Sequence, residues 1–448
     1  MSLNTTQCWN PYPVYKDSGV EWLGQLPELW EMKRLKFCVS SGFQYGANIA
    51  AELTDHDLPR YIRITDMNDD GTLKDDTFRS LAYEQAEPYL LRNKDILLAR
   101  SGATVGKSFM YDKSMGIAAY AGYLIRISPH NTVNADYLYA FINSNSYWQW
   151  INSIFIQATI QNVSAEKYAN LILPVPPLDE QHAIASFLDR ECARIDSLIE
   201  KKRRLLELLD EKRRAVITQA VTRGLDPNVP MKESGVEWLG EVPDGWDVLP
   251  IKFVASIFYG LSEPPEYQQE GVHFIRATDI HAGEIYTDTI LHVDPNDIPA
   301  HRIFWLVSGD IIIVRSGAYT GDSAIIPSCL EGSIAGYDMI LRCKKIHPKF
   351  VQWALLSNYL KDGQINLQKM RAAQPHLNAE QLKICRLILP PFPEQHAIAS
   401  YLDAETAAID ARRQAHEQSI TLLQEYRASL ITQAVTGKID VREYKPEQ

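Results

Sequence analysis

The chain has 448 residues, with 45 Lys and Arg against 56 Asp and Glu, so its formal net charge at pH 7 is -11. A hydrophobic content of 46% and an aromatic content of 10% are typical of a globular protein and argue against long disordered regions. The length predicts about two to four domains, and the acidic balance disfavours a simple polycationic coat for nucleic acid.

The N-terminal sequence and the cysteines indicate the cellular compartment. The first ten residues show no basic segment followed by an apolar stretch, so we expect no secretory signal. The six cysteines are scattered and form no CxxC pair, which favours free thiols over disulfides or zinc. No apolar run approaches the roughly 18 residues of a membrane span. The sequence therefore predicts a cytoplasmic protein.

An internal duplication organises the whole chain. Residues 16–24 read KDSGVEWLG, and residues 232–240 read KESGVEWLG. The heptapeptide EQHAIAS occurs at residues 180–186 and again at 394–400. The offset is close to half the chain length, which is too long for a solenoid repeat. It indicates two copies of one unit and predicts a pseudo-twofold molecule with two equivalent surfaces.

Each copy begins with a mixed region. Residues 31–173 and 247–389 combine short apolar runs with Gly, Asn and Asp turns, which predicts strands and a few helices. Proline-rich segments at 173–177 and 389–393 then interrupt regular structure.

A long helix is expected after each proline-rich segment. Residues 178–223 and 394–436 contain neither Gly nor Pro and carry apolar residues at alternating steps of four and three. An apolar stripe with this spacing needs a partner helix, and the simplest partner is the other copy in the same chain. At ~1.5 Å per residue, such a segment makes a rod of roughly 60 Å.

Motifs that would indicate catalysis are incomplete. Residues 102–108 resemble a phosphate-binding loop but have three residues between the glycines instead of four. The duplicate at 317–323 has Asp322 where the first copy has Lys107. The sequence contains no complete Asn/Asp-Pro-Pro-aromatic methyltransferase tetrapeptide and no HExxH motif. A catalytic methyltransferase or nuclease is therefore disfavoured, and we expect no catalytic or metal-binding residues.

The duplicated order of these motifs resembles the specificity subunits of type I restriction–modification systems over essentially the whole chain. The resemblance is carried by residues 173–188 with 389–402, by 19–30 with 235–246, and by 95–102 with 310–317. It implies an α+β fold in which two pseudo-twofold-related α/β target-recognition domains are joined by two long helices packed as an antiparallel coiled coil. The implied parts are target-recognition domain 1 at 1–173, spacer helix 1 at 174–227, target-recognition domain 2 at 228–389 and spacer helix 2 at 390–448.

The resemblance also implies a function. The chain would be a non-catalytic subunit that recognises double-stranded DNA, each domain reading one half of a bipartite target. The helical spacers would set the distance between half-sites and dock two methyltransferase subunits, and restriction/translocase subunits would complete the complex. No cofactor is expected on this chain, because S-adenosylmethionine, ATP and Mg would be bound by partner subunits. The alternative is a duplicated coiled-coil scaffold or adaptor without DNA recognition.

Polar and basic residues of the two domains are the candidates for DNA contact, because polar side chains read base edges while Lys and Arg hold phosphates. In the first domain they are Gln44, Tyr45, Asn48, Arg63, Thr65, Asn68, Arg100, Lys107, Gln157, Gln161 and Asn162. In the second domain they are Tyr259, Ser262, Arg276, Thr278, His281, Arg315, Tyr319, Lys369, Arg371, Gln374 and His376. Arg100 and Arg315 recur in both copies, so we expect them to hold the DNA backbone or the protein structure.

The remaining expectations come from the helix starts and from the repeat frame, which is the alignment of the two copies of the duplicated sequence. The residues expected to form the spacer and dock partners are Glu180, Gln181, Ile184, Leu188, Ile195, Glu394, Gln395, Ile398, Leu402 and Ile409. Trp22, Trp30, Trp238 and Trp246 are expected to pack between helix end and domain. Because the termini occupy the places that residues 221–232 fill mid-chain, we expect them to lie close together. The negative charge predicts weak DNA binding by the chain alone.

Overall fold

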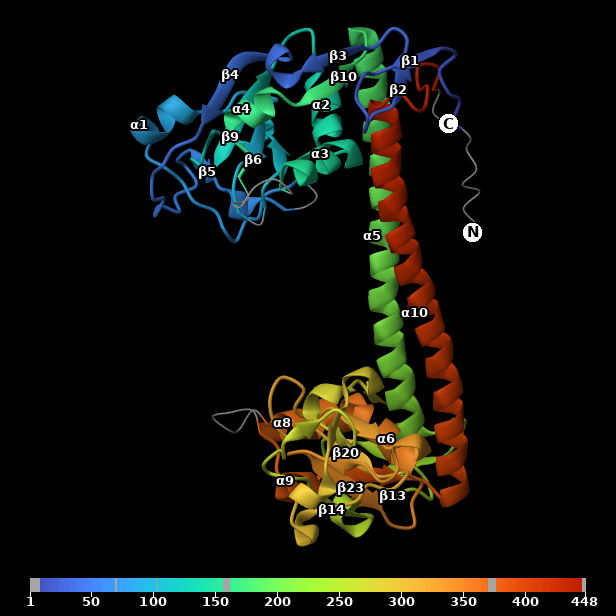
Figure 1. Cartoon of the computed structure of the whole chain (residues 1–448). Coiled ribbons are helices and arrows are strands. Elements are labelled where there is room, and N and C mark those ends of the chain that lie inside the picture. The colour runs from blue at the N-terminus through green and yellow to red at the C-terminus, as the bar shows by residue number, and fades with distance from the viewer. Residues whose placement is uncertain (1–8, 69–70, 103, 156–161, 370–375, 445–448) are drawn as a thin grey trace. The chain divides into compact units, whose positions relative to one another are not determined.

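The computed structural model describes residues 9–68, 71–102, 104–155, 162–369 and 376–444 (Figure 1). The chain forms two compact units. Unit 1 comprises residues 1–202 and 418–448, and unit 2 comprises residues 203–417. Each unit contains one α/β domain together with a part of each long helix. The internal duplication in the sequence is thus a duplication of folded units.

The main sheet of unit 1 has four antiparallel strands in the order β4–β9–β6–β7. These strands are β4 (Val39–Tyr45), β9 (Leu124–Pro129), β6 (Ile96–Ala99) and β7 (Ser108–Met110). Three further pairs are β1 (Tyr15–Asp17) with β2 (Gln25–Pro27), β3 (Glu31–Arg34) with β10 (Ile172–Val175), and, in parallel, β5 (Arg60–Ile62) with β8 (Ala118–Tyr120). The short helices are α1 (Tyr83–Ala86), α2 (Ala135–Ile142), α3 (Asn145–Phe155) and α4 (Ala165–Ala169).

Unit 2 repeats the main sheet in the order β14–β23–β20–β21. These strands are β14 (Ala255–Tyr259), β23 (Met339–Cys343), β20 (Ile311–Ile313) and β21 (Ser323–Ile325). A second sheet has the order β15–β19–β16–β22, formed by β15 (Tyr267–Gln268), β19 (Leu291–Val293), β16 (Val272–Ile275) and β22 (Ile334–Ala335). The parallel pairing of β16 with β22 corresponds to that of β5 with β8.

The other elements of unit 2 are short. The strand pairs are β11 (Met231–Glu233) with β12 (Glu241–Pro243), β13 (Asp247–Pro250) with β24 (Arg386–Leu389), and β17 (Ile280–His281) with β18 (Glu284–Ile285). The helices are α6 (Pro348–Leu356), α7 (Asn358–Leu360), a π-helical turn (Lys361–Ile365), α8 (Asn366–Lys369) and α9 (Ala379–Ile384).

The central strand of each main sheet is buried on both faces. In β6, Ile96 and Leu98 enter one apolar cluster, whereas Leu97 and Ala99 enter another. In β20, Ile311 also lies in a different cluster from the adjacent Ile312. An uninterrupted apolar run is what a strand covered on both sides requires. The chain that leaves such a strand is therefore held in a fixed position, and the site described below is built there.

The two long helices are α5 (Leu178–Arg223) and α10 (Phe392–Val435). In unit 2, Asp210 pairs with Arg413 at 3.2 Å and Arg213 pairs with Asp410 at 3.5 Å. A step forward along α5 thus corresponds to an equal step back along α10, so the helices run antiparallel there. In unit 1, Asp196 of α5 pairs with Arg427 of α10 at 2.9 Å.

The predicted long helices are confirmed, with one difference at the start of the second. Helix α10 begins at Phe392 and includes Pro393, whereas the sequence predicted a start at residue 394. Proline is accommodated because the first turn of a helix does not need its N–H group. The predicted domain boundaries at 173, 227 and 389 stay a prediction.

Tryptophans join each helix start to its domain. The buried Trp30 donates its indole N–H to Glu180 Oε1 at 3.0 Å, and Trp246 donates to Glu394 Oε2 at 2.9 Å. The packing role predicted from the sequence is confirmed for these two residues. It is wrong for Trp238, whose side chain is 53% exposed.

The described parts of the two chain ends pack together inside unit 1, as the repeat frame predicted. The backbone N–H of Asp440 donates to the carbonyl of Asn10 at 2.7 Å. The Tyr15 hydroxyl donates to the Gly437 carbonyl at 3.0 Å, and the Lys438 ammonium donates to the Gln25 carbonyl at 2.7 Å.

Candidate nucleic-acid interface

An arginine stacked on a tyrosine lies at the end of the buried central strand of unit 1. The guanidinium of Arg100, directly after β6, lies 4.7 Å from the ring centroid of Tyr45, the last residue of β4. The Tyr45 hydroxyl accepts a hydrogen bond from the backbone N–H of Ala165 at the start of α4, at 3.2 Å. An isolated bridge pairs Ser101 with Asn162. The fold thus brings together Tyr45, Arg100 and Asn162, which are all predicted DNA contacts.

Unit 2 repeats this arrangement and adds a second ring. The Arg315 guanidinium lies 4.6 Å from the ring centroid of Tyr259 and 4.3 Å from that of Tyr337. The Tyr259 hydroxyl accepts from the backbone N–H of Ala379 at the start of α9, at 2.8 Å. Arg315 Nη2 also lies 2.8 Å from Nε2 of His376. Because arginine has only donors, His376 Nε2 is the acceptor in this bond.

The stacked arginines are fixed yet remain beside the surface. Tyr45, Tyr259 and Tyr337 are each between 43% and 46% exposed, so all three side chains are partly open to solvent. The Nε atoms of Arg100 and Arg315 are buried and have no hydrogen-bond partner among the described residues. Stacking on an aromatic face orients a guanidinium and leaves its in-plane N–H groups free to bind. Such a group can donate to a phosphate or to a base edge.

A buried carboxyl distinguishes the site of unit 2. Asp338 is 1% exposed, and its Oδ1 accepts a hydrogen bond from the backbone N–H of Arg315 at 3.2 Å. Its Oδ2 is buried without a partner among the described residues, and burial raises the pKa of this carboxyl to about 6. Residues 336–338 read GYD, and the corresponding residues 122–124 of unit 1 read GYL. Unit 1 therefore has Leu124 in place of Asp338. The two sites therefore share an arginine–tyrosine frame and differ in the groups around it.

A second polar group in unit 2 surrounds Asp322. His281 Nδ1 lies 3.1 Å from Asp322 Oδ2, and the Lys361 ammonium donates to Asp322 Oδ1. The rings of His281 and Tyr319 lie 5.1 Å apart between centroids. The structure thus places the predicted residues His281 and Tyr319 next to each other. In unit 1, the half-buried Lys107 takes the position of Asp322.

Two other predicted arginines hold turns. Arg63 donates through Nε and Nη2 to the two carboxylate oxygens of Asp66, at 3.1 and 2.7 Å, and Arg276 makes the same two bonds to Asp279, at 3.1 and 2.8 Å. Each also donates to a backbone carbonyl, at 2.7 Å. Asp66 and Asp279 are at most 1% exposed, and a buried carboxylate needs such a partner. The recurrence of these arginines in the two copies therefore has a structural reason.

The family described as "Type I restriction modification DNA specificity domain" matches residues 27–208 and 243–421. The chain belongs to this family. The resemblance seen in the sequence is thereby confirmed, and the two matched segments correspond to the duplicated units.

Relatives in this family match most of the chain. The putative type I restriction enzyme MjaX specificity subunit of Methanocaldococcus jannaschii is 25% identical over 434 residues, 94% of this chain and 96% of the relative. The MjaVIII specificity subunit of the same organism is 24% identical over 362 residues, 79% of this chain and 81% of the relative. A chain from a solved type I restriction–modification system superposes with a TM-score of 0.67 at 17% identity, covering 92% of this chain and 99% of that chain. The predicted fold class of duplicated α/β domains with long antiparallel helices is confirmed.

Neither a metal-binding cluster nor a membrane-spanning helix is found within the described residues. No cluster of three or more His, Cys, Asp or Glu side chains in those segments is arranged to hold a metal ion. In the same segments, no helix is both long enough and apolar enough to cross a membrane.

Several of the remaining DNA-contact candidates bind other side chains of the protein. Gln44 accepts a hydrogen bond from Arg126, Ser262 accepts one from Arg302 at 3.3 Å, and Asn68 donates to Thr72 at 2.9 Å. The other candidates within the described residues are the exposed Asn48, Thr65 and Thr278, together with Lys369, the last residue of α8. Four predicted residues lie outside the described segments: Gln157, Gln161, Arg371 and Gln374. A DNA role for all of these residues stays a prediction.

The Glu-Gln pairs at the helix starts attach each helix to its domain. Gln181 accepts from the backbone N–H of Asn134 at 2.7 Å and donates to the Pro176 carbonyl at 2.8 Å. Gln395 makes the equivalent bonds to His347 at 2.9 Å and Pro390 at 2.8 Å. These contacts explain in physical terms why EQHAIAS occurs twice.

The apolar residues predicted for the spacer are inside it. None is more than 4% exposed, and they are Ile184, Leu188, Ile195, Ile398, Leu402 and Ile409. They pack within their own unit, so a partner subunit would have to contact other residues of the helices. Partner docking by the spacer stays a prediction.

Sequence reasoning missed Tyr337 and Asp338. Both lie between Gly336 and β23, where an acidic residue replaces the Leu124 of the first copy. An aspartate at an apolar position of the repeat was the available signal.

Proposed function

We propose that this chain is the non-catalytic DNA-recognition subunit of a type I restriction–modification complex, each α/β domain reading one half of a bipartite target. The observation that carries the proposal is the arginine stacked on tyrosine at the same place in both units, with different neighbours in each. Two domains that recognise different half-sites need the same arginine–tyrosine stack with different residues next to it. A scaffold without DNA recognition would have no need of it.

The common residues and the variable residues have different tasks. Arg100 and Arg315 are the same residue type in the same setting, so they cannot distinguish two different half-sites, and we assign them to phosphate contact. The half-buried groups that differ at the equivalent position are Asn162 in unit 1 and His376 in unit 2, whereas the buried Asp338 accepts from the Arg315 backbone N–H. An asparagine amide pairs well with adenine, and an imidazole nitrogen can donate to or accept from a base edge. These residues are the proposed readers.

Catalysis and most of the DNA affinity are assigned to partners. In this proposal two methyltransferase subunits and the restriction/translocase subunits bind S-adenosylmethionine, ATP and Mg, while this chain binds no cofactor and works in the cytoplasm. The incomplete phosphate-binding and methyltransferase motifs support this division. A net charge of -11 supports it as well, because phosphate contacts dominate affinity and require cationic groups. The paired helices act as the spacer that fixes the distance between half-sites.

The test is sequence-selective methylation by the assembled complex. The chain is co-expressed with methyltransferase subunits, and methylated positions in genomic DNA are mapped by sequencing. Methylation confined to one bipartite sequence supports the proposal. Copurification of the subunits without sequence-selective methylation supports the scaffold instead.

A further inference from the structure

In unit 1, aromatic residues from both ends of the chain cover one point on helix α5. The Phe187 ring is fully buried between Trp9 and Tyr444, whose centroids lie 4.8 and 4.9 Å away in edge-to-face geometry. The Tyr444 hydroxyl donates to the buried carboxylate of Glu191 at 2.6 Å. A third aromatic residue, Tyr12, donates to Glu180. The apolar surface of the helix and both carboxylates are therefore satisfied within the unit.

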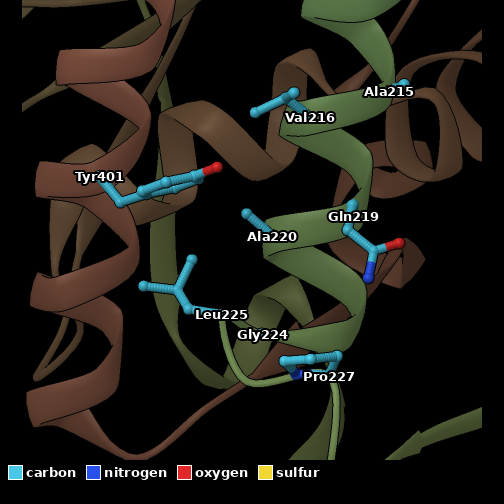
Figure 2. A pocket seen from close by; sticks show the side chains of 8 residues that line it. All are labelled: Ala215, Val216, Gln219, Ala220, Gly224, Leu225, Pro227 and Tyr401. Carbon is cyan, nitrogen blue, oxygen red and sulfur yellow. The ribbon is translucent and has the colours of Figure 1, made fainter.

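The equivalent place in unit 2 is an open groove. The sequence SFLD at 186–189 corresponds to SYLD at 400–403, so Tyr401 is the counterpart of Phe187. Tyr401 of α10 faces Val216, Ala220 and Leu225 across a groove of about 530 Å³ (Figure 2). Tyr401 is 40% exposed and Leu225 is 42% exposed, whereas Phe187 is fully buried.

The aromatic residues that close the groove of unit 1 are missing from the sequence of unit 2. In the repeat frame, the counterparts of Trp9, Tyr12 and Tyr444 are Leu225, Asn228 and Pro230. The residues outside the described segments contain no Trp, Tyr or Phe that could replace them. The groove, whose one aromatic lining residue is Tyr401, therefore has no aromatic occupant from these parts of the chain.

Two carboxylates of α10, one before and one after Tyr401 in the sequence, also lack the tyrosine partners of their counterparts in unit 1. Glu394, the counterpart of Glu180, accepts only the Trp246 indole N–H through Oε2 among the described residues. Glu405, the counterpart of Glu191, is half-buried and has no hydrogen bond or ion pair to any described residue. In unit 1, tyrosine hydroxyls bind at both of these positions. The open positions fit an incoming hydroxyl or indole N–H.

We propose that the groove of unit 2 is a docking site for a partner subunit, which inserts a tyrosine or tryptophan side chain against Tyr401 and Leu225. The occupied groove of unit 1 shows the chemistry of the occupant: an aromatic ring that carries a hydrogen-bond donor. Docking of this kind occurs in unit 2 alone, because unit 1 supplies its own rings.

Photo-crosslinking within the assembled complex tests this inference, which rests on the proposed function for the identity of the subunits used as the probe. Tyr401→p-benzoylphenylalanine is introduced, and the chain is co-expressed with methyltransferase subunits. We expect a crosslink to a partner segment that contains Trp or Tyr. The matched control is Leu422→p-benzoylphenylalanine, at a 64% exposed position of α10 in unit 1, which should not crosslink to that segment.

A second variant closes the groove without touching the buried core. In the crosslinking chain, Leu225→Trp restores the residue type of unit 1, and we expect the yield at position 401 to fall about tenfold, as for a loss of about 1.4 kcal/mol in binding. Leu225→Ala should leave the groove open and retain the crosslink. Crosslinks that form only within this chain, or that reach a partner segment lacking Trp and Tyr, overturn the inference. Sequence-selective methylation without a crosslink at position 401 refutes docking at the groove and leaves the proposed function standing. Unselective methylation by the unsubstituted complex refutes the proposed function itself.

Discussion

The buried carboxyl of Asp338 makes the stability of unit 2 depend on pH. Burial raises its pKa from the ordinary value of 3.8 to about 6, so the folded unit holds the proton over a range where the unfolded chain has released it. The stability that this carboxyl contributes is therefore fully present below pH 3.8 and is lost as the pH rises through about 6. A shift of about two pH units at roughly 1.36 kcal/mol each corresponds to about 3 kcal/mol.

Asp338→Asn removes this ionisation while keeping an oxygen that can accept the Arg315 N–H. We expect the variant and the parent to be similarly stable at pH 4 and the variant to be more stable by about 3 kcal/mol at pH 7. Native-state hydrogen exchange at the amides of β20 and β23 measures unfolding of unit 2 separately from unit 1. The exposed Asp288→Asn should keep the pH profile of the parent. A parent-like profile in Asp338→Asn would refute the assignment of this pH dependence to the buried carboxyl.

Two further predictions concern the turns and the chain ends. Arg276→Ala leaves the buried Asp279 without its ion pair and should destabilise unit 2 by about 3–5 kcal/mol in denaturant unfolding followed by hydrogen exchange; a loss below about 1 kcal/mol would show that the guanidinium is not needed for the turn. A circular permutant opened at Asn228, with Gln448 joined to Met1, should retain DNA recognition, because the described chain ends already pack together in unit 1. Loss of sequence-selective methylation by a folded permutant would contradict this.

The sequence predicted the features that depend on regular spacing. Apolar steps of four and three specify a helix that needs a partner, and the repeat frame alone placed residues 437–440 beside the start of the chain. Burial of Trp30 and Trp246 followed from the same frame. These predictions succeed because periodicity and duplication are properties of the chain itself.

The candidate site was harder to predict from the sequence, because it depends on contacts between segments that are distant along the chain. Tyr45 and Arg100 were both named, but their stacking requires the order β4–β9–β6, which brings in a strand from residues 124–129. The bond of Arg63 to Asp66 depends on the geometry of the turn, which the sequence does not specify. Tyr337 was missed because nothing in its local sequence separates a stacking partner from an ordinary surface tyrosine.

The measurement that tests the central claim most directly is the methylation pattern of complexes carrying Asn162→Ala or His376→Ala. Each variant is co-expressed with methyltransferase subunits, and the methylated sequences are compared with those of the parent. The account predicts that Asn162→Ala relaxes the preference in one half of the bipartite target and that His376→Ala relaxes it in the other half only. A change in the same half for both variants, or an unchanged preference in both, would contradict the assignment of one reader to each domain.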